Sequence, residues 1–574
     1  MTLLAPDFDC EVTDTPAGPR RLSPPHTTRR TALRVITVGL ALGSVYSLIS
    51  TGVNPLTLWF ERDSIGNLLD RMWPVQLDNA GSVFGHAIDT FFMAFLGTMF
   101  AVGLALPIGW CAASNMVGNR LARGVARAVI VLTRAVPDLI LAMIFVRVFS
   151  IGALAGILAL AIHSVGMLGK LFADALEQVD AGPREGVAAT GASRWQELMS
   201  GVVPQVVPSF IATSLYRLDI NFRSATLLGI VGAGGIGLDI KVAQGGLNYP
   251  QLLGVTLVII AMIVVFEVVS TAVRSVILGP TANVRRSWWT RLTGRLGPND
   301  PTPDAAAIAL PISRRSVVQP WNRERLTMYL FGISCVILTV LSFVVTEVSF
   351  FEFLGGVADL PAMFWNLVPK SFDWWDDRFI VDFTETIMMG FAATAIALVF
   401  ALPTGFLAAR NVAPARWVYG VARIFILMVR ALPDLIVAVI FVAALGLGPK
   451  PGVLALSIGL YAFAAKLFAD AIEEVREGPR DGVRATGATG VQESFSGVLS
   501  QAMPALVGHS LYLLDVSIRS STVLGIVGAG GIGYSLIGGA RLLKWEMIGG
   551  LLIILFVIVY AIELLAGWVR KQII

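Results

Sequence analysis

The sequence repeats itself once, at an offset of 296 residues and without a gap over the well-matched region. KLFADALEQVDAGPREGVAATG at 170–191 aligns with KLFADAIEEVREGPRDGVRATG at 466–487, with 16 of 22 positions identical. FRSATLLGIVGAGGIG at 222–237 likewise aligns with IRSSTVLGIVGAGGIG at 518–533. A match this long at one fixed period indicates a structural unit that is present twice. We therefore expect two fused copies of one unit.

Each copy contains about six apolar stretches that are long enough to cross a bilayer. The chain is 55% hydrophobic and only 14% charged, whereas soluble domains carry about 25% charged residues. An even number of spans gives both copies the same orientation, so the repeat is parallel. We expect an all-α membrane protein with about 12 transmembrane helices. The predicted spans are 33–52, 84–112, 124–148, 151–174, 205–231 and 251–278, then 328–346, 381–409, 420–446, 452–470, 501–527 and 547–569.

Charge predicts the side of the membrane on which the polar segments lie. The segment 281–325 between the copies carries eight arginines against three acids, and the N-terminal segment and Arg570–Lys571 are basic too. The segments after each first span are acidic, as at Glu61 and Asp63. Basic residues accumulate on the cytosolic side, so we predict that both termini are cytosolic. The predicted domains are a basic tail (1–32), a first unit (33–280), a basic linker (281–325) and a second unit (326–574).

One polar segment lies between the fourth and fifth spans of each copy, at 181–193 and 477–489. Each starts with Gly-Pro, which favours a helix start. Gly191 and Gly487 then interrupt the helix, and a second short helix is expected after each. Two short cytosolic helices around a Gly could dock into a groove of a partner protein. The alternative is an amphipathic connector at the membrane surface.

These segments resemble the coupling loop of ABC importer permeases. That loop has an acid, two small residues, three more residues and a Gly, with Leu-Pro or similar thirteen residues after the Gly. The first copy reads EGVAATG at 185–191 and VP at 203–204, and the second reads DGVRATG at 481–487. The second copy has LS at 499–500, where Pro is usual. The two docking sites are therefore expected to be unequal.

The closer resemblance is to phosphonate-type permeases, and it covers roughly 80–280 and 380–570. It is carried by RAVPDL and RALPDL, and by SLYRLDINFRSATLLGIVGAGGIG and SLYLLDVSIRSSTVLGIVGAGGIG. It implies two ABC type I importer permease units related by a pseudo-twofold axis, fused here although such units usually dimerise. It also implies a bacterial inner-membrane permease subunit of an ATP-driven importer for phosphonate or related phosphorus oxyanions, without enzymatic activity of its own.

The resemblance also implies partners and contact residues. Two cytosolic ABC ATPase subunits would hold ATP and Mg, so this chain needs no cofactor; an extracytoplasmic phosphonate-binding protein would deliver a small anionic substrate. No Gly-x-x-x-x-Gly-Lys-Ser/Thr phosphate loop occurs in the sequence. No nucleic acid and no metal site are expected. The predicted ATPase-coupling residues are Arg184, Glu185, Gly186, Ala189 and Gly191, with Arg480, Asp481, Gly482, Ala485 and Gly487.

Charged residues inside the spans give independent evidence for an anion. Each copy has two oppositely charged pairs four residues apart, which is one helical turn, so each pair can form a salt bridge on one face. An Arg at mid-bilayer costs roughly 2.5–3.5 kcal/mol or more, so such residues favour a protein-lined or wet pathway. The alternative is that each Arg only pairs with its own Asp. The predicted pathway residues are Arg223 and Asp219, Arg519 and Asp515, and Arg134 and Arg430, the last two paired with Asp138 and Asp434.

GAGGIG at 232–237 and 528–533 fits the dinucleotide fingerprint, but it follows a predicted transmembrane helix instead of a strand, which excludes that function. We predict a glycine turn at the outer end of the fifth span, where the path closes or the binding protein docks, and where N–H groups could form an anion nest. The residues of this turn are Gly232, Gly234, Gly235, Gly528, Gly530 and Gly531. Other functions stay open: an ABC permease for phosphate, phosphite or an amino acid, and an ion-driven secondary transporter.

Overall fold

The computed structural model describes residues 28–277 and 323–573, and every regular element there is helical. The predicted tail and linker lie almost wholly outside this part of the chain. The first copy contains α1 (Thr28–Ser50), α2 (Pro55–Met72), α3 (Ala80–Ala112), α4 (Arg120–Ala135), α5 (Asp138–Phe149), α6 (Ala153–Glu177), α7 (Ala181–Ala189), α8 (Arg194–Glu197), α9 (Val203–Leu228), α10 (Gly237–Gly245) and α11 (Tyr249–Ile277). The second contains α13 (Arg323–Val345), α14 (Phe350–Leu367), α15 (Arg378–Leu407), α16 (Arg416–Arg430), α17 (Asp434–Leu445), α18 (Pro449–Glu473), α19 (Glu477–Ala485), α20 (Gly490–Glu493), α21 (Ser500–Leu524), α22 (Ile532–Arg541) and α23 (Trp545–Ile573).

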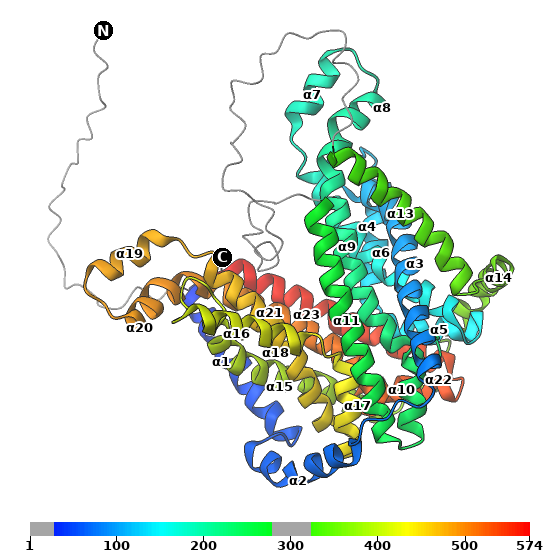
Figure 1. Ribbon diagram of the computed structural model, residues 1–574, viewed down its shortest axis with the longest axis vertical. Helices are drawn as coiled ribbons and strands as arrows, with labels where there is room; N and C mark the ends of the chain where they lie inside the picture. Colours follow the sequence, from blue (N-terminus) through cyan, green and yellow to red (C-terminus); the bar gives the residue numbers. More distant parts are fainter. Residues whose placement is uncertain (1–27, 278–322, 574) are drawn as a thin grey trace.

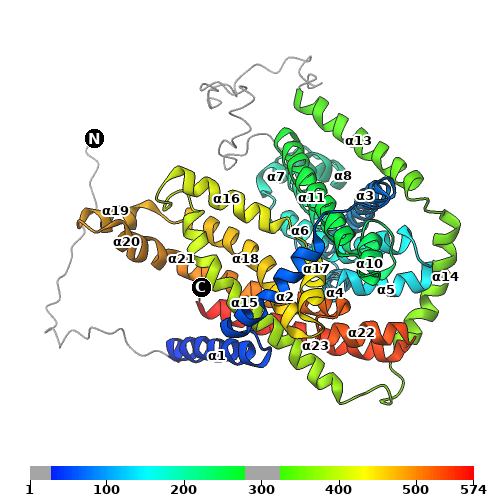
Figure 2. The ribbon, with the colours of Figure 1, turned by 60° about the horizontal axis from the view of Figure 1, so that its bottom comes forward.

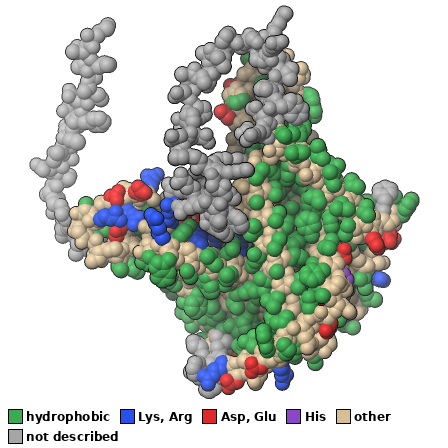
Figure 3. All heavy atoms as spheres, in the orientation of Figure 1, with side chains coloured by type: hydrophobic (Ala, Val, Ile, Leu, Met, Phe, Trp, Pro, Cys, Tyr) green, Lys and Arg blue, Asp and Glu red, His purple; other side chains and the backbone are tan. Residues whose placement is uncertain are grey.

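The described residues contain nine helices that are long and apolar enough to cross a membrane, or eleven when each of two bent pairs counts as one span. The described apolar part of α1, Val38–Ser50, is shorter than a span. Hydrophobic side chains also cover much of the visible face of the helix bundle (Figure 3). The all-α membrane fold is therefore confirmed. The third predicted span of each copy is not one continuous helix, because α4 and α5 meet at 92° and α16 and α17 meet at 74°.

Glycines bring the central helices of each copy close together. A Cβ atom at Gly109 on α3 would lie 2.9 Å from Cβ of Phe172 on α6, and a Cβ at Gly405 on α15 would lie 2.9 Å from Cβ of Phe468 on α18. Without a hydrophobic drive between helices in lipid, small residues allow the close backbone contact that packing needs. The pairs α3–α6 and α15–α18 therefore form the core of the two copies.

The first helices are exchanged between the copies. α1 of the first copy packs on α15 of the second, and α13 of the second packs on α3 of the first. α2 contacts α17, and α14 contacts α5. The Lys450 ammonium at the start of α18 also pairs with the Glu61 carboxylate on α2. The two sequence repeats thus fold as one interlocked body, which Figures 1 and 2 show from two directions.

The helices α2 and α14 lie where the sequence predicted only acidic loops. α2 begins with Pro55 at its first turn and is capped by Asn54, whose side chain accepts a hydrogen bond from the Thr57 amide. Asn at the N-cap and Pro just inside the helix are the usual start signals. Two short helices, α10 and α22, also follow the glycine turns.

Candidate functional site

The predicted polar segments fold as two helical hairpins, α7–α8 and α19–α20, which project separately from the helix bundle (Figure 1). Gly191 and Gly487 both have φ +78°, a left-handed conformation that strongly favours Gly, and they end the first helix of each hairpin. α7 is capped by Asp180, which accepts a hydrogen bond from the Gly182 amide at 3.0 Å. The predicted helix–Gly–helix arrangement is thus confirmed. The predicted coupling residues Glu185, Gly186 and Ala189, with Asp481, Gly482 and Ala485, are exposed.

An ion pair closes each hairpin. Arg184 pairs with Glu197 in the first, and Arg480 pairs with Glu493 in the second. The second hairpin has an additional bond, since Arg484 Nη2 lies 2.9 Å from Glu493 Oε1, whereas Ala188 occupies the equivalent position of the first. The two predicted coupling arginines, Arg184 and Arg480, therefore stabilise the hairpins internally.

Exposed apolar side chains lie at equivalent positions on the two hairpins. Trp195 is 66% exposed and Met199 is 40% exposed on the first; Val491 is 68% exposed and Phe495 is 65% exposed on the second. The sequence prediction placed these residues in the second short helix of each segment but did not single them out as contact residues. Exposed apolar side chains at matching positions, rimmed by charges, are typical of protein interaction sites.

The charged pairs on the fifth spans differ between the copies. Arg519 Nη2 lies 3.1 Å from Asp515 Oδ2, as the spacing predicted. In the first copy the salt bridge of Arg223 is with Glu267 on α11, at 3.9 Å, and the predicted pairing with Asp219 is replaced. Asp219 lies close enough to interact electrostatically with both Glu267 and Arg223. The charge on α11 was not considered in the sequence prediction.

The bend in each third span separates the other two predicted pairs. Arg134 ends α4 and Asp138 begins α5, so their spacing of four residues does not correspond to one helical turn. Arg430 and Asp434 are separated in the same way. The predicted same-face pairing is therefore wrong here, because Pro137 and Pro433 cap new helices in place of continuing the old ones.

At the bends, charged residues of one copy lie near charged residues of the other. Arg430 of the second copy interacts electrostatically with Asp219 of the first. Asp434 interacts with Arg223 in the same manner. Arg134 of the first copy interacts in turn with Tyr512 of the second. The predicted intramembrane charges thus come from both copies to one interface.

Arg223 and Arg519 share one further property. The Nε atom of each is buried and has no hydrogen-bond partner among the described residues. A buried donor without a partner costs about 1–3 kcal/mol. Both arginines sit at equivalent positions of the repeat, so the same unused donor occurs in each copy.

Among the described residues, the first copy has a buried polar network around an arginine, and the second copy keeps one of its contacts, between the Thr394 and Ser517 hydroxyls at 2.8 Å. Arg217 is 3% exposed, and its Nε donates to Ser164 Oγ at 2.8 Å. Ser164 Oγ donates to Asn221 Oδ1 at 2.9 Å, and Asn221 Nδ2 donates to Thr98 Oγ1 at 2.9 Å. The repeat places Leu513 and Leu460 at the positions of Arg217 and Ser164. Self-alignment could have found this asymmetry, but the prediction kept only residues that recur.

The glycine turns follow α9 and α21 as predicted. Gly232, Gly234 and Gly235 have φ between +75° and +95°, and Gly528, Gly530 and Gly531 have φ between +69° and +94°. In the second copy the Gly531 amide donates to Glu385 Oε2 at 3.0 Å, and the Ile532 amide donates to Thr386 Oγ1 at 2.9 Å. Two N–H groups of the expected anion nest are therefore already occupied.

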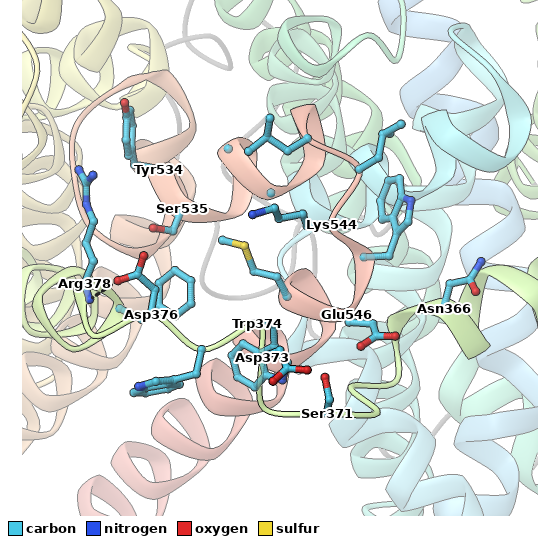
Figure 4. Close-up of a pocket in the computed structure, with 18 residues that line it drawn as sticks. Asn366, Ser371, Asp373, Trp374, Asp376, Arg378, Tyr534, Ser535, Lys544 and Glu546 are labelled. Carbon is cyan, nitrogen blue, oxygen red and sulfur yellow. Dashed lines mark hydrogen bonds between the residues drawn. The ribbon is translucent and has the colours of Figure 1, made fainter.

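A polar cavity of about 830 Å³ opens beside the second turn, at the end of the bundle opposite to the hairpins. Figure 4 shows Asp373, Asp376 and Glu546 around it, with Lys544 and Arg378. The Arg378 guanidinium lies 5.8 Å from the centre of the Tyr534 ring, and Ser535 donates to Asp382. The equivalent contact in the first copy joins His86 to Asp239 at 2.9 Å. These contacts fasten α22 and α10 to the central helices.

The chain matches one protein family twice. Residues 105–278 and 401–573 match "Binding-protein-dependent transport system inner membrane component". Among curated proteins, a phosphate-import permease protein of Mycolicibacterium smegmatis is 44% identical over 91% of each chain. A phosphite transport system permease protein of Stutzerimonas stutzeri is 38% identical over 38% of this chain and 79% of its own. Among solved structures, the MetNI methionine ABC transporter in an inward-facing conformation matches 34% of this chain and 96% of the solved chain, with 24% identity and a TM-score of 0.32.

Proposed function

The chain belongs to the family of binding-protein-dependent transport system inner membrane components, as a fused two-copy ABC importer permease, and we propose that it moves phosphorus oxyanions between its copies. Relatives named for the import of phosphate and the transport of phosphite support this substrate class. Inorganic phosphate, phosphite and phosphonates share a tetrahedral phosphorus bearing anionic oxygens.

The observation that carries the proposal is the pair of equivalent arginines, Arg223 and Arg519, each with a buried Nε donor that has no partner in the part of the chain that the structure describes. A guanidinium presents donors in a planar fork that matches two oxygens of a phosphoryl group. The carboxylate of Glu267 pairs with Arg223 and that of Asp515 pairs with Arg519, so each occupies part of a guanidinium group. They reduce the net positive charge, so a passing anion is bound weakly enough to be released.

The hairpins supply the coupling to ATP hydrolysis in this proposal. One ATPase subunit binds α7–α8 and a second binds α19–α20, with ATP and Mg held by those subunits. The exposed Trp195 and Phe495 side chains would enter grooves on them. Since the hairpins continue directly into α9 and α21, a displacement of a hairpin moves the helix that carries Arg223 or Arg519.

The hairpin end would face the cytosol. Basic residues near this end of the bundle support that orientation: Arg120, Arg123, Arg127, Arg410, Arg416 and Arg423. Acidic residues of α2 and of the 373–377 segment lie at the opposite end, where an extracytoplasmic binding protein would deliver the anion. Both termini would then be cytosolic, in a bacterial inner membrane.

The test is uptake by the complete transporter in proteoliposomes, with ATPase subunits and binding protein supplied. Labelled phosphate should enter only with ATP, and unlabelled phosphite or methylphosphonate should compete at micromolar concentrations, while an amino acid should not. An uncoupler should leave uptake unchanged. Uptake driven by an ion gradient without ATPase subunits, or competition by amino acids alone, would refute the proposal.

A further inference from the structure

A second cavity, of about 1140 Å³, lies between the two copies at the end opposite to the hairpins. The C-terminal part of α5, with α10, forms one side, and α22 and the following turn form the other. Figures 1 and 2 show α5, α10 and α22 gathered at this end of the molecule. We name this cavity the mouth.

Three cations line the mouth: Arg147, Lys241 and Arg541. No Asp or Glu is among the described residues that line it. All three side chains are exposed, and the structure shows no hydrogen bond or ion pair between any of them and another described residue. The adjacent polar cavity of Figure 4 shares Tyr534, Leu543 and Trp545 with the mouth but carries three acids. The positive charge is therefore local to the mouth.

None of these cations recurs in the repeat. Arg147 corresponds to Ala443, Lys241 corresponds to Ile537, and Arg541 corresponds to Gly245. Two cations thus come from the first copy and one from the second. The cationic rim is asymmetric, in contrast to the equivalent arginines deeper in the bundle.

The floor of the mouth is apolar and symmetric. Ile230 and Val231 of the first copy line it together with their equivalents Ile526 and Val527. We call these four side chains the collar; Ile151 and Leu447, which are also equivalent, line the mouth as exposed side chains outside it. Arg223 precedes Ile230 by seven residues, and Arg519 precedes Ile526 by seven. Seven helical residues span about 10 Å, so the collar separates the cations of the mouth from the arginine pair.

We propose that the mouth is an anion-receiving site, in which Arg147, Lys241 and Arg541 hold a phosphorus oxyanion above the collar before it passes to Arg223 and Arg519. This inference rests on the proposed function. Unpaired cations on low-dielectric walls concentrate anions and raise their arrival rate by tenfold or more. The collar keeps the path closed until the helices move, so the mouth holds the anion during the interval between delivery and opening.

The repeat itself supplies the variant that tests this. Replacing each cation by the residue of the other copy, R147A with K241I and R541G, gives a symmetrised mouth. Arg71→Ala is the control, since Arg71 is an exposed cation on α2 that lies outside the mouth. Size-exclusion profiles of the complex with the ATPase subunits and its basal ATPase activity establish that each variant folds and assembles.

The first readout needs no transport. A cysteine at Leu447, which is 73% exposed in the mouth, is introduced after the native cysteines are replaced by Ser. Its reaction rate is measured with an anionic and with a cationic methanethiosulfonate reagent. Symmetrising the mouth should lower the anionic-to-cationic rate ratio about threefold at 0.15 M ionic strength, and more at lower salt. Arg71→Ala should leave it unchanged, and an unchanged ratio in the symmetrised variant would overturn the proposal.

The second readout is phosphate uptake by the complete transporter. Phosphate uptake by the symmetrised variant should be about tenfold slower at low salt, and its affinity for the binding protein should be unchanged. A lowered anionic-to-cationic reaction rate ratio together with a normal phosphate uptake rate would overturn the receiving role. Weakened binding of the binding protein would assign the cations to docking and would overturn it too. If the unmodified transporter carries no phosphorus oxyanion, the proposed function fails. The anionic-to-cationic reaction rate ratio of the introduced cysteine then decides whether the mouth attracts anions.

Discussion

Replacing Trp195 by Ala should weaken the attachment of the ATPase subunit to the first hairpin. Trp195 is 66% exposed and projects from α8. A Trp side chain buries up to about 250 Å², so about 165 Å² is available for an interface, worth at most ~4 kcal/mol at 25 cal/mol per Å². Incomplete burial and the ordering of the side chain reduce this to about 2 kcal/mol, which is roughly a 30-fold loss of affinity.

The assay is a binding titration of the purified permease with labelled ATPase subunits in detergent. Trp365→Ala is a matched control, because Trp365 is also 66% exposed but lies on α14, away from the hairpins. The control should bind as the unmodified chain does. A change below threefold for Trp195→Ala, or an equal loss in the control, would refute the role of the hairpin in docking.

Three further predictions concern the hairpin and the packing. Gly191→Val should strain the left-handed turn by about 1–2 kcal/mol and uncouple ATP hydrolysis from uptake; normal coupled uptake would contradict this. Gly109→Val should force apart α3 and α6 at Phe172 and destabilise the protein by about 1–3 kcal/mol, which a lower melting temperature in detergent would show and an unchanged one would exclude. Glu61→Gln should remove the ion pair with Lys450 and cost about 1 kcal/mol, detectable as a small shift in the same melt, whereas Lys450→Gln added to it should cost little more.

The repeat made much of the fold predictable. Because the same pattern occurs twice, each apolar span and each polar segment was supported by two independent stretches of sequence. The interruption of the helix at Gly191 and Gly487 was predicted from the conformational freedom of Gly, and in the structure both residues have a left-handed φ. The predicted cytosolic tail and linker, which fixed the predicted orientation, lie almost wholly outside the described residues.

The site was less predictable because it depends on contacts that sequence spacing does not encode. The bend after Arg134 depends on Pro137, and a hydropathy pattern runs through such a bend without a signal. The pairing of Arg223 with Glu267 joins two helices that are distant in sequence. The buried Arg217 and the cations of the mouth were overlooked because the sequence analysis kept only residues that recur in both copies, and each of these residues occurs in one copy.

Whether the anion passes between Arg223 and Arg519 is tested most directly by measuring ATP hydrolysis and phosphate uptake in the same proteoliposomes. The unmodified transporter is compared with the Arg223→Ala, Arg519→Ala double variant. In the unmodified transporter, phosphate uptake should be proportional to ATP hydrolysis. The double variant should continue to hydrolyse ATP and should lose at least ten times more uptake than hydrolysis. If phosphate still enters at the unmodified rate per ATP, the anion does not pass between these arginines.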